Sequence, residues 1–220
     1  MITLALDAST YRGTVAVLEE SRVLVASSAP MRGRDVEHLM PAVVQALANA
    51  GATMSDVGRV VCGNGPGSFT SLRIAASIAK GIAVGRSVPL FSVSSLALIV
   101  AGNVSDGPRG ARRYLAVQDA MRGESYIAEC EHDAGDVRQL RPHSIIPTAT
   151  VPSHAEAVAA RAVGPDTADP WHPHARGVAL MLASIMAAGP VDLSAWEPTY
   201  GRLAEAQVKW EAAQGRALER

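Results

Sequence analysis

The sequence lacks an excess of charge of either sign. Its 20 Lys and Arg residues face 21 Asp and Glu residues, which leaves a formal net charge of -1 over 220 residues. A chain without a strong positive field does not gather nucleic acid or an anionic membrane by long-range electrostatics. Only a local patch could bind such partners.

Cysteine is also scarce. Cys62 and Cys130 are the only two, and their spacing resembles no zinc motif. A chain of this length does not need disulfides to stabilise a core, so the two residues are predicted to be free thiols in a reducing compartment. We therefore expect a cytoplasmic location.

Long apolar runs are missing. The longest, "GVALMLASIMAAG" at residues 177–189, falls short of the roughly 18 residues that a membrane span needs, and it is interpreted as a core helix. The first residues, "MITLALDAST", have no basic start, and Asp7 interrupts the apolar run, so they predict a buried strand and not a signal peptide. No membrane partner is expected.

The hydrophobic pattern predicts a mixed α/β fold. Three strands joined by short turns are expected at residues 2–6, 13–18 and 22–28, followed by a helix from Asp35 to Ala50 that begins near Pro41 or is kinked by it. A strand at 59–62, a helix at 71–84 ended by Gly85, the strand "PLFSVSS" and the helix "SLALIVAGN" follow. Three antiparallel strands and then alternating helices and strands resemble the two-lobed ribonuclease-H-like fold of the actin, sugar-kinase and Hsp70 (ASKHA) superfamily.

A glycine- and proline-rich stretch suggests where the first lobe ends. The expected division is a first lobe at residues 1–103, a linker at 104–108 and a smaller second lobe at 109–220. A strand pair around the turn at residues 121–123, a helix at 153–160 and another at 174–188 are assigned to the second lobe, whose pattern is a reduced copy of the first.

The segment "GNGPGSFTSLRIAASIAKG" at residues 63–81 joins a predicted strand to a predicted helix. Glycines there permit positive φ, and hydroxyls beside a helix N-terminus can help to bind an anion. The alternative is a tight turn in which Ser68 or Thr70 caps the helix. Asp7 lies at the end of an apolar strand, where the resemblance to the ASKHA superfamily implies that it faces a Mg-nucleotide. Alternatively it accepts hydrogen bonds from the backbone of Ser9 and Thr10, and this structural role is favoured. The candidates for a nucleotide or phosphate loop are thus Asp7, Ser9, Thr10, Gly65, Gly67, Ser68 and Thr70.

Motifs of catalysis are missing from the same segment and from the rest of the chain. No lysine follows the last glycine of the loop until Lys80, which excludes a Walker A motif, and Ser68 lacks the glycines of a nucleophile elbow. His172 and His174 stand two residues apart and share no helical face, so no metal site is predicted. No catalytic residue is assigned.

The helix after the loop carries small residues on much of its surface, which would allow another helix to approach closely. Packing on the sheet explains one face; the other suggests a partner site formed with the earlier helix. The small residues are Ala75, Ala76, Ala79, Gly81, Ala83 and Gly85. The interface candidates are Leu39, Val43, Leu47, Leu72, Ala75, Ala76 and Ala79.

The segments "LALDAST", "GNGPGSFTSLRIAASIAKGIA", "FSVSSLA", "QDAMRGESY" and "EPTYGRLAEAQVKWE" occur in the order found in the bacterial TsaB family, also called YeaZ. The resemblance runs from about residue 2 to residue 211. It implies a two-lobed actin-like fold and a role in forming threonylcarbamoyladenosine beside the anticodon of ANN-reading tRNAs.

The same resemblance implies a chain that is not catalytic by itself. It would bind its paralogue TsaD, which holds the metal and transfers the threonylcarbamoyl group, with the ATPase TsaE as a third subunit. This chain would need no cofactor, ATP or ADP and metal would bind the partner subunits, and tRNA would be met through the complex. A homodimer through the first two helices is expected when TsaD is absent. The alternative is an actin-like ATP-dependent transferase or peptidase that acts on its own.

The chain departs from the family pattern in two segments. Ser71 and Ala75 stand where glycines are usual, and residues 35–37 replace a histidine-serine-glutamate motif with Asp35, Val36 and Glu37. Both glycine replacements raise helix propensity and add bulk. Individual interface contacts of the family therefore do not transfer directly.

Overall fold

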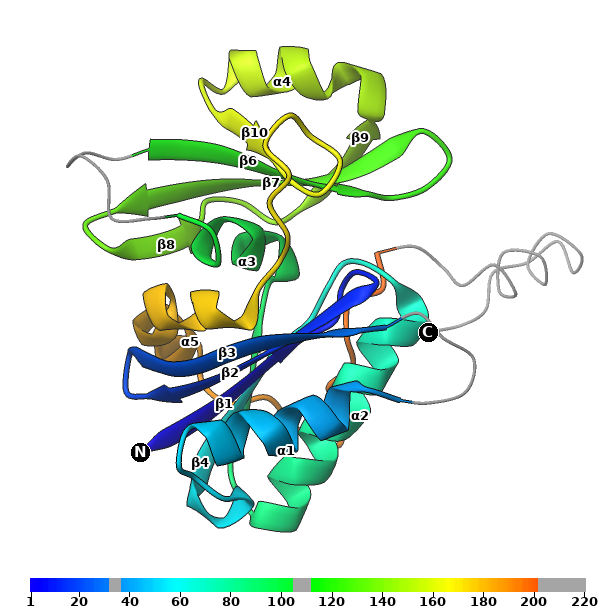
Figure 1. Cartoon of the computed structure of the whole chain (residues 1–220). Coiled ribbons are helices and arrows are strands. Elements are labelled where there is room, and N and C mark those ends of the chain that lie inside the picture. Colours follow the sequence, from blue (N-terminus) through cyan, green and yellow to red (C-terminus); the bar gives the residue numbers. More distant parts are fainter. Residues whose placement is uncertain (32–36, 105–111, 202–220) are drawn as a thin grey trace, which may run out of the picture.

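The computed structural model of the chain describes residues 1–31, 37–104 and 112–201 (Figure 1). The first sheet contains β1 (Ile2–Asp7), β2 (Arg12–Glu19), β3 (Arg22–Pro30), β4 (Val57–Gly63) and β5 (Leu90–Val93) in the order β3-β2-β1-β4-β5. β2 pairs antiparallel with both β1 and β3, whereas β4 pairs parallel with both β1 and β5. The predicted meander followed by parallel strands is confirmed.

The second sheet also has five strands and repeats part of this topology. It contains β6 (Arg112–Asp119), β7 (Glu124–Asp133), β8 (Asp136–Gln139), β9 (Ser144–Pro147) and β10 (Arg161–Val163). In the order β10-β6-β7-β8, β6 pairs antiparallel with β7 and parallel with β10, as β1 does with β2 and β4. β9 pairs with the other end of β7. The fold is therefore the expected two-lobed, actin-like one with a reduced second lobe.

The two faces of the first sheet carry different helices, because successive side chains of a strand point to opposite faces. Leu4 and Leu6 of β1 pack with α1 (Leu39–Asn49) and α2 (Phe69–Arg86), whereas Ala5 belongs to the core between the two sheets. That central core contains α3 (Ser95–Ala101) and α5 (Leu182–Ala188), and α4 (Val151–Ala157) covers the outer face of the second sheet (Figure 1).

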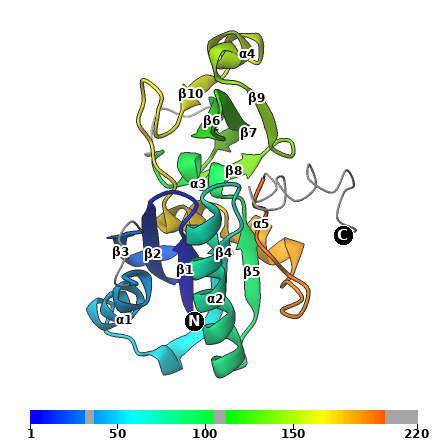
Figure 2. The ribbon, with the colours of Figure 1, turned by 90° about the vertical axis from the view of Figure 1, so that its right-hand side faces the viewer.

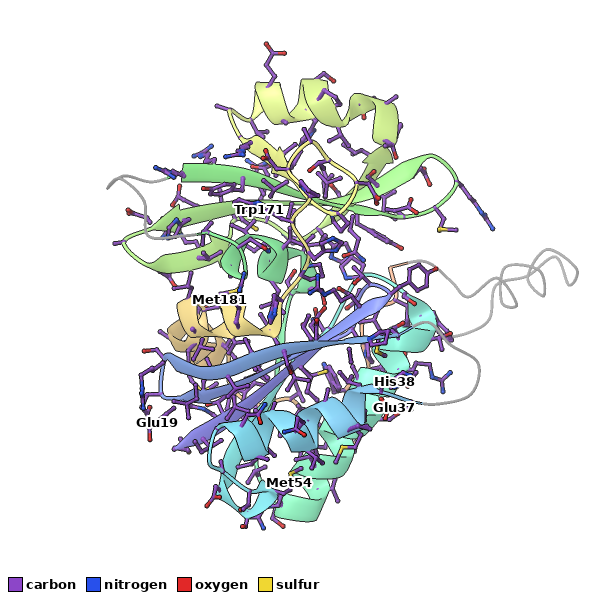
Figure 3. All side chains as sticks on the ribbon, in the orientation of Figure 1. Glu19, Glu37, His38, Met54, Trp171 and Met181 are labelled. Carbon is purple, nitrogen blue, oxygen red and sulfur yellow. The ribbon has the colours of Figure 1, made fainter. Side chains whose placement is uncertain are left out.

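The sequence-based helix boundaries need small changes. α1 begins at Leu39, so Pro41 lies in its first turn, where a missing amide proton is tolerated. The carboxylate of Glu37, just before the helix (Figure 3), accepts hydrogen bonds from the amides of Leu39 and Met40. α2 continues past Gly85 to Arg86 and ends where Ser87 adopts φ of 52°.

The segment after residue 174 lies between the sheets and against the first one. A 3-10 helix, η3 (Ala175–Leu180), contacts β1, β2 and β3, and α5 contacts β5. Farther on, the amide of Val191 donates to the carbonyl of Leu90, and the chain runs beside β5 (Figure 2). Assigning the helix at 174–188 to the second lobe was therefore wrong, because its apolar residues complete the core between the sheets. Most of the proposed linker, residues 105–108, lies outside the described residues.

Candidate functional site

The glycine loop at residues 63–68 connects β4 to α2, and its amides bind other parts of the chain. The amide of Asn64 donates to the carbonyl of Val93 (2.8 Å), and that of Ser68 donates to the carbonyl of Ser9 (2.7 Å). The amide of Gly65 donates to the hydroxyl of Ser95 (2.9 Å). An anion could use these three donors only if they left their present acceptors.

Contacts within the chain also explain the glycines of this loop. A Cβ atom on Gly67 would overlap the carbonyl oxygen of Ser9, and one on Gly63 would overlap the carboxylate of Asp7. Gly65 has φ of +88°, and a Cβ there would overlap the carbonyl oxygen of Thr199. Close packing of the backbone therefore requires glycine, without any need for a bound phosphate.

Asp7 is fully buried at the end of β1. One carboxylate oxygen accepts from the hydroxyl of Ser95 (2.5 Å), and the other accepts from the amide (3.1 Å) and the hydroxyl (3.0 Å) of Ser9. Burial raises the pKa of Asp7, and the hydrogen bonds from Ser95 and Ser9 oppose that increase. The predicted hydrogen bond from the backbone of Ser9 is confirmed, whereas the hydroxyl of Thr10 bonds the backbone of Arg12 within the turn.

Ser68 and Thr70 do not cap α2 through their side chains. Ser68 is the N-cap residue, but its hydroxyl pairs with that of Ser71 (3.0 Å), and Thr70 is exposed. Ser71 and Ala75, the two replacements of family glycines, are buried. Their added bulk therefore lies inside the chain, whereas Asp35 lies outside the described residues.

The thiols show no sign of nucleophilic chemistry. Cys62 and Cys130 are buried and free, as predicted. Burial raises the pKa of Cys130 to about 12, and that of Cys62 is also raised by burial and by the nearby Asp7. Since the thiolate is the reactive form, both thiols are expected to be inert.

The predicted interface residues are buried in the chain's own interior. Leu39, Val43, Leu47, Leu72, Ala75, Ala76 and Ala79 each have at most 6% of their surface exposed. The helical periodicity that selected them marks the stripe facing the sheet. They are therefore wrong as direct contact residues, although they do belong to the two helices that the sequence indicated.

An apolar groove lies between α1, α2 and the short 3-10 helix η1 (Met54–Asp56). Its volume is about 420 Å³. Its apolar lining comes from Met40 of α1, Met54 of η1 (Figure 3), and Ile78 and Ile82 of α2. Ser77, Gly81, Gly85 and Arg86 complete it.

Exposed valines from the same helices add to this face. Val44 of α1 is 55% exposed and Val84 of α2 is 64% exposed. Helical periodicity did not single out the two valines, because they are out of phase with the buried stripe, and Met40 and Met54 were not among the predicted interface residues. That phase difference was the available signal. We call the groove and these two valines the α1–α2 face.

Contacts among the described residues do not explain Gly81 and Gly85. A Cβ atom added to either would meet no heavy atom within 4 Å, and neither residue has a positive φ. Glycine in the interior of a helix costs about 1 kcal/mol relative to alanine, which applies fully to Gly81 and less to Gly85 near the helix end. Both glycines line the groove and leave room for close approach from outside.

The two helices carry no acidic residue, and α2 contributes Arg73, Lys80 and Arg86. The guanidinium of Arg86 donates to the carbonyl of Ser55 (2.7 Å), and the ammonium of Lys80 lies 5.6 Å from the ring centre of Trp196. The α1–α2 face is thus apolar with basic residues in α2.

Metal-binding clusters and membrane-spanning helices are both absent from the described ranges 1–31, 37–104 and 112–201. These ranges contain no group of three or more His, Cys, Asp or Glu side chains placed to hold a metal ion. None of their helices has the length and apolar character needed to span a membrane.

Comparison with known proteins identifies the family. A family model described as "TsaD: tRNA N6-adenosine threonylcarbamoyltransferase" matches residues 34–158. The chain belongs to this family, and it is similar to proteins named TsaB and YeaZ. The match includes α1, the glycine loop and α2.

Individual relatives agree with this assignment. The tRNA threonylcarbamoyladenosine biosynthesis protein TsaB of Escherichia coli is 34% identical over 137 residues, which are 62% of this chain and 58% of that protein. TsaB of Bacillus subtilis is 31% identical, over 64% of this chain and 60% of the relative. The matched part therefore spans less than two thirds of these relatives. The structure of YeaZ from Pseudomonas aeruginosa superposes with a TM-score of 0.73 at 27% identity, over 90% of this chain and 99% of the other.

Proposed function

We propose that this chain is a noncatalytic subunit in the biosynthesis of threonylcarbamoyladenosine in tRNA, and that it binds a TsaD paralogue through the α1–α2 face. The observation that carries the proposal is that Gly81 and Gly85 line an apolar groove, although packing among the described residues does not require glycine at either position. Family membership and the names of the relatives support the pathway.

A helix of the partner suits this groove. Glycines at positions i and i+4 lie on one face of α2, so another helix backbone can approach there without meeting a side chain. Met40, Met54 and Ile78 would surround an apolar side chain of that helix. Because the two helices hold no acidic residue, acidic side chains at the rim of the partner surface would be favoured. A second copy of this chain would use the same face when the paralogue is absent.

The remaining roles are assigned to the other subunits. We propose that TsaE joins the complex in the cytoplasm, that ATP or ADP and metal bind the partner subunits, and that tRNA is met through the complex. The alternative, an enzyme acting alone, is disfavoured by the loop. Its Asn64, Gly65 and Ser68 amides bind the chain itself, and Asp7 is buried with both carboxylate oxygens hydrogen-bonded.

The test places a charge on the α1–α2 face without disturbing the core. Val44→Glu and Val84→Glu change exposed valines of this face, and Val23→Glu changes a 37% exposed valine of β3 outside the groove. Each variant would be mixed with the TsaD paralogue and analysed by size-exclusion chromatography. Each would also be tested for restoring modified tRNA in cells that lack this protein.

We expect both face variants to lose the complex and the modification, while Val23→Glu retains both. Desolvating a carboxylate in an apolar contact without a partner costs several kcal/mol, enough to abolish binding. If Val44→Glu and Val84→Glu bind the paralogue as well as the unchanged chain does, the assigned face is wrong. If modification continues in cells without the protein, its proposed role fails.

Calorimetry separates the alternative enzyme from the proposed subunit. Tight binding of Mg-ATP to the isolated chain, with turnover that Asp7→Ala abolishes, would favour an enzyme acting alone. We expect no turnover.

A further inference from the structure

Residues 198–201, which we call the latch, join parts of both sheets. On the side of the first sheet, the amide of Thr199 donates to the carbonyl of Asn64 in the glycine loop (2.7 Å). The ring of Tyr200 packs on Phe69, the first residue of α2, with 4.6 Å between ring centres. The latch is therefore bound both to the loop and to the start of the helix.

The same four residues reach β7 of the second sheet. The hydroxyl of Tyr126 donates to the carbonyl of Tyr200 (3.5 Å). Gly201 has φ of +77°, and a Cβ there would come within 2.6 Å of the Tyr126 ring. Close packing thus fixes the latch on this side as well.

The two sheets meet beside the latch, at a place that we call the junction, where Gln118 of β6 contacts Ser9 and Pro66. One polar atom of Gln118 has no hydrogen-bond partner among the described residues. This residue of β6 is 6% exposed, and its amide nitrogen donates to the carbonyls of Ser9 (3.1 Å) and Pro66 (3.3 Å). Its side-chain oxygen is buried and has no hydrogen-bond partner among the described residues. An unpaired buried acceptor destabilises the state that buries it, and water would pair it if the junction opened.

We propose that the latch keeps the junction between the two sheets closed, and that its release opens the junction at Gln118 and loosens the glycine loop and the first turn of α2 together. Opposing contributions support two states: the latch contacts favour closure, and the unpaired oxygen of Gln118 favours opening. Since Phe69 begins α2, opening would also affect the α1–α2 face, a consequence that rests on the proposed function.

Hydrogen exchange on the isolated full-length chain tests the coupling. In Tyr200→Ala, amides in residues 64–72 and in residues 124–128 should both exchange about tenfold faster, because exchange reports the free energy of local opening. Tyr11→Ala, which removes a 53% exposed tyrosine outside the latch, is the matched control and should leave both segments unchanged. Faster exchange in only one segment, or in neither, would overturn the proposal.

Gly65→Ala provides a second test from the opposite end. Its Cβ would push against the carbonyl oxygen of Thr199 in the latch, while a second link joins the loop to the second sheet between Pro66 and Gln118 of β6. Faster exchange at residues 124–128 in this variant supports coupling through the latch, and an effect confined to the loop contradicts it. Intact exchange protection in β1 and β4 would show that both variants remain folded.

A titration with the TsaD paralogue separates this inference from the proposed function. If Tyr200→Ala shows the coupled exchange and also binds several-fold more weakly, the link to the α1–α2 face is supported. Coupled exchange with unchanged binding by a competent paralogue overturns that link. A paralogue that does not bind even the unchanged chain contradicts the proposed function, while the exchange result still decides the latch.

Discussion

Replacing Gly81 should stabilise the isolated chain and weaken its complex. Alanine at this position meets no atom within 4 Å and requires no unusual φ, so it adds helix propensity without a clash. The expected gain is about 0.8–1.0 kcal/mol in the free energy of unfolding. For a chain of 220 residues this corresponds to a rise of about 2–4 °C in the melting temperature. A larger side chain, in Gly81→Leu, would in addition occupy the groove beside Met40 and Ile78.

Urea unfolding and titration with the TsaD paralogue measure the two effects separately. Gly81→Ala should raise the urea midpoint without changing the slope. Gly81→Leu should lower the affinity by about tenfold or more, since forcing a side chain into a close contact costs about 1–3 kcal/mol. Ala48→Leu, an exposed position of α1 outside the groove lining, is the control. A destabilised Gly81→Ala would refute the helix argument, and unchanged affinity of Gly81→Leu would refute close approach at this glycine.

Three further outcomes follow from buried groups. Leu72→Ala should lower the free energy of unfolding by about 2–5 kcal/mol in a urea titration, because Leu72 is fully buried; a loss of partner binding without a loss of stability would contradict its burial. Burial, with Arg176 and Arg12 nearby, lowers the pKa of His174 from 6.5 to about 4. As pH drops from 6.5 towards 4, His174 therefore takes up a proton in the unfolded chain but not in the folded chain, and the free energy of unfolding should fall. His174→Gln should flatten that part of the urea pH profile, and an unaltered profile would exclude His174 as its source. The raised pKa of Asp7 acts with the opposite sign, because the stabilising contribution of Asp7 is present below pH 3.8 and declines as pH rises through the folded pKa. Asp7→Asn should remove this decline in stability. A decline that persists in the variant would have to be assigned to another group.

Much of the fold could be predicted because it depends on local patterns. Alternating apolar residues indicated the strands, and three strands joined by two short turns, followed by helix–strand alternation, indicated the order of the first sheet. The return of the chain after residue 174 could not be predicted in the same way. The apolar residues of η3 and α5 suit any core, and only the space left between the two sheets determines which core they complete.

The candidate site was predicted less well. The sequence indicated the two helices, but periodicity selects the stripe that is buried, and a partner would contact the opposite one. Val44 and Val84 are single apolar residues at polar positions, which is common on protein surfaces and gave no strong signal. The glycine loop was ambiguous for a related reason, because glycine allows close approach by a ligand and by the chain's own backbone alike.

The sequence by itself determined the elements, the glycine-rich turn, the free thiols and the family, because each of these depends on residue type and short-range spacing. Only the tertiary structure separated the glycines by role. Gly63, Gly65 and Gly67 are required by Asp7, Thr199 and Ser9, which lie far from them in the sequence, whereas a Cβ atom on Gly81 or Gly85 would meet no heavy atom of the described residues within 4 Å. Whether a Cβ atom has room depends on residues brought together by folding, and local sequence does not contain that information.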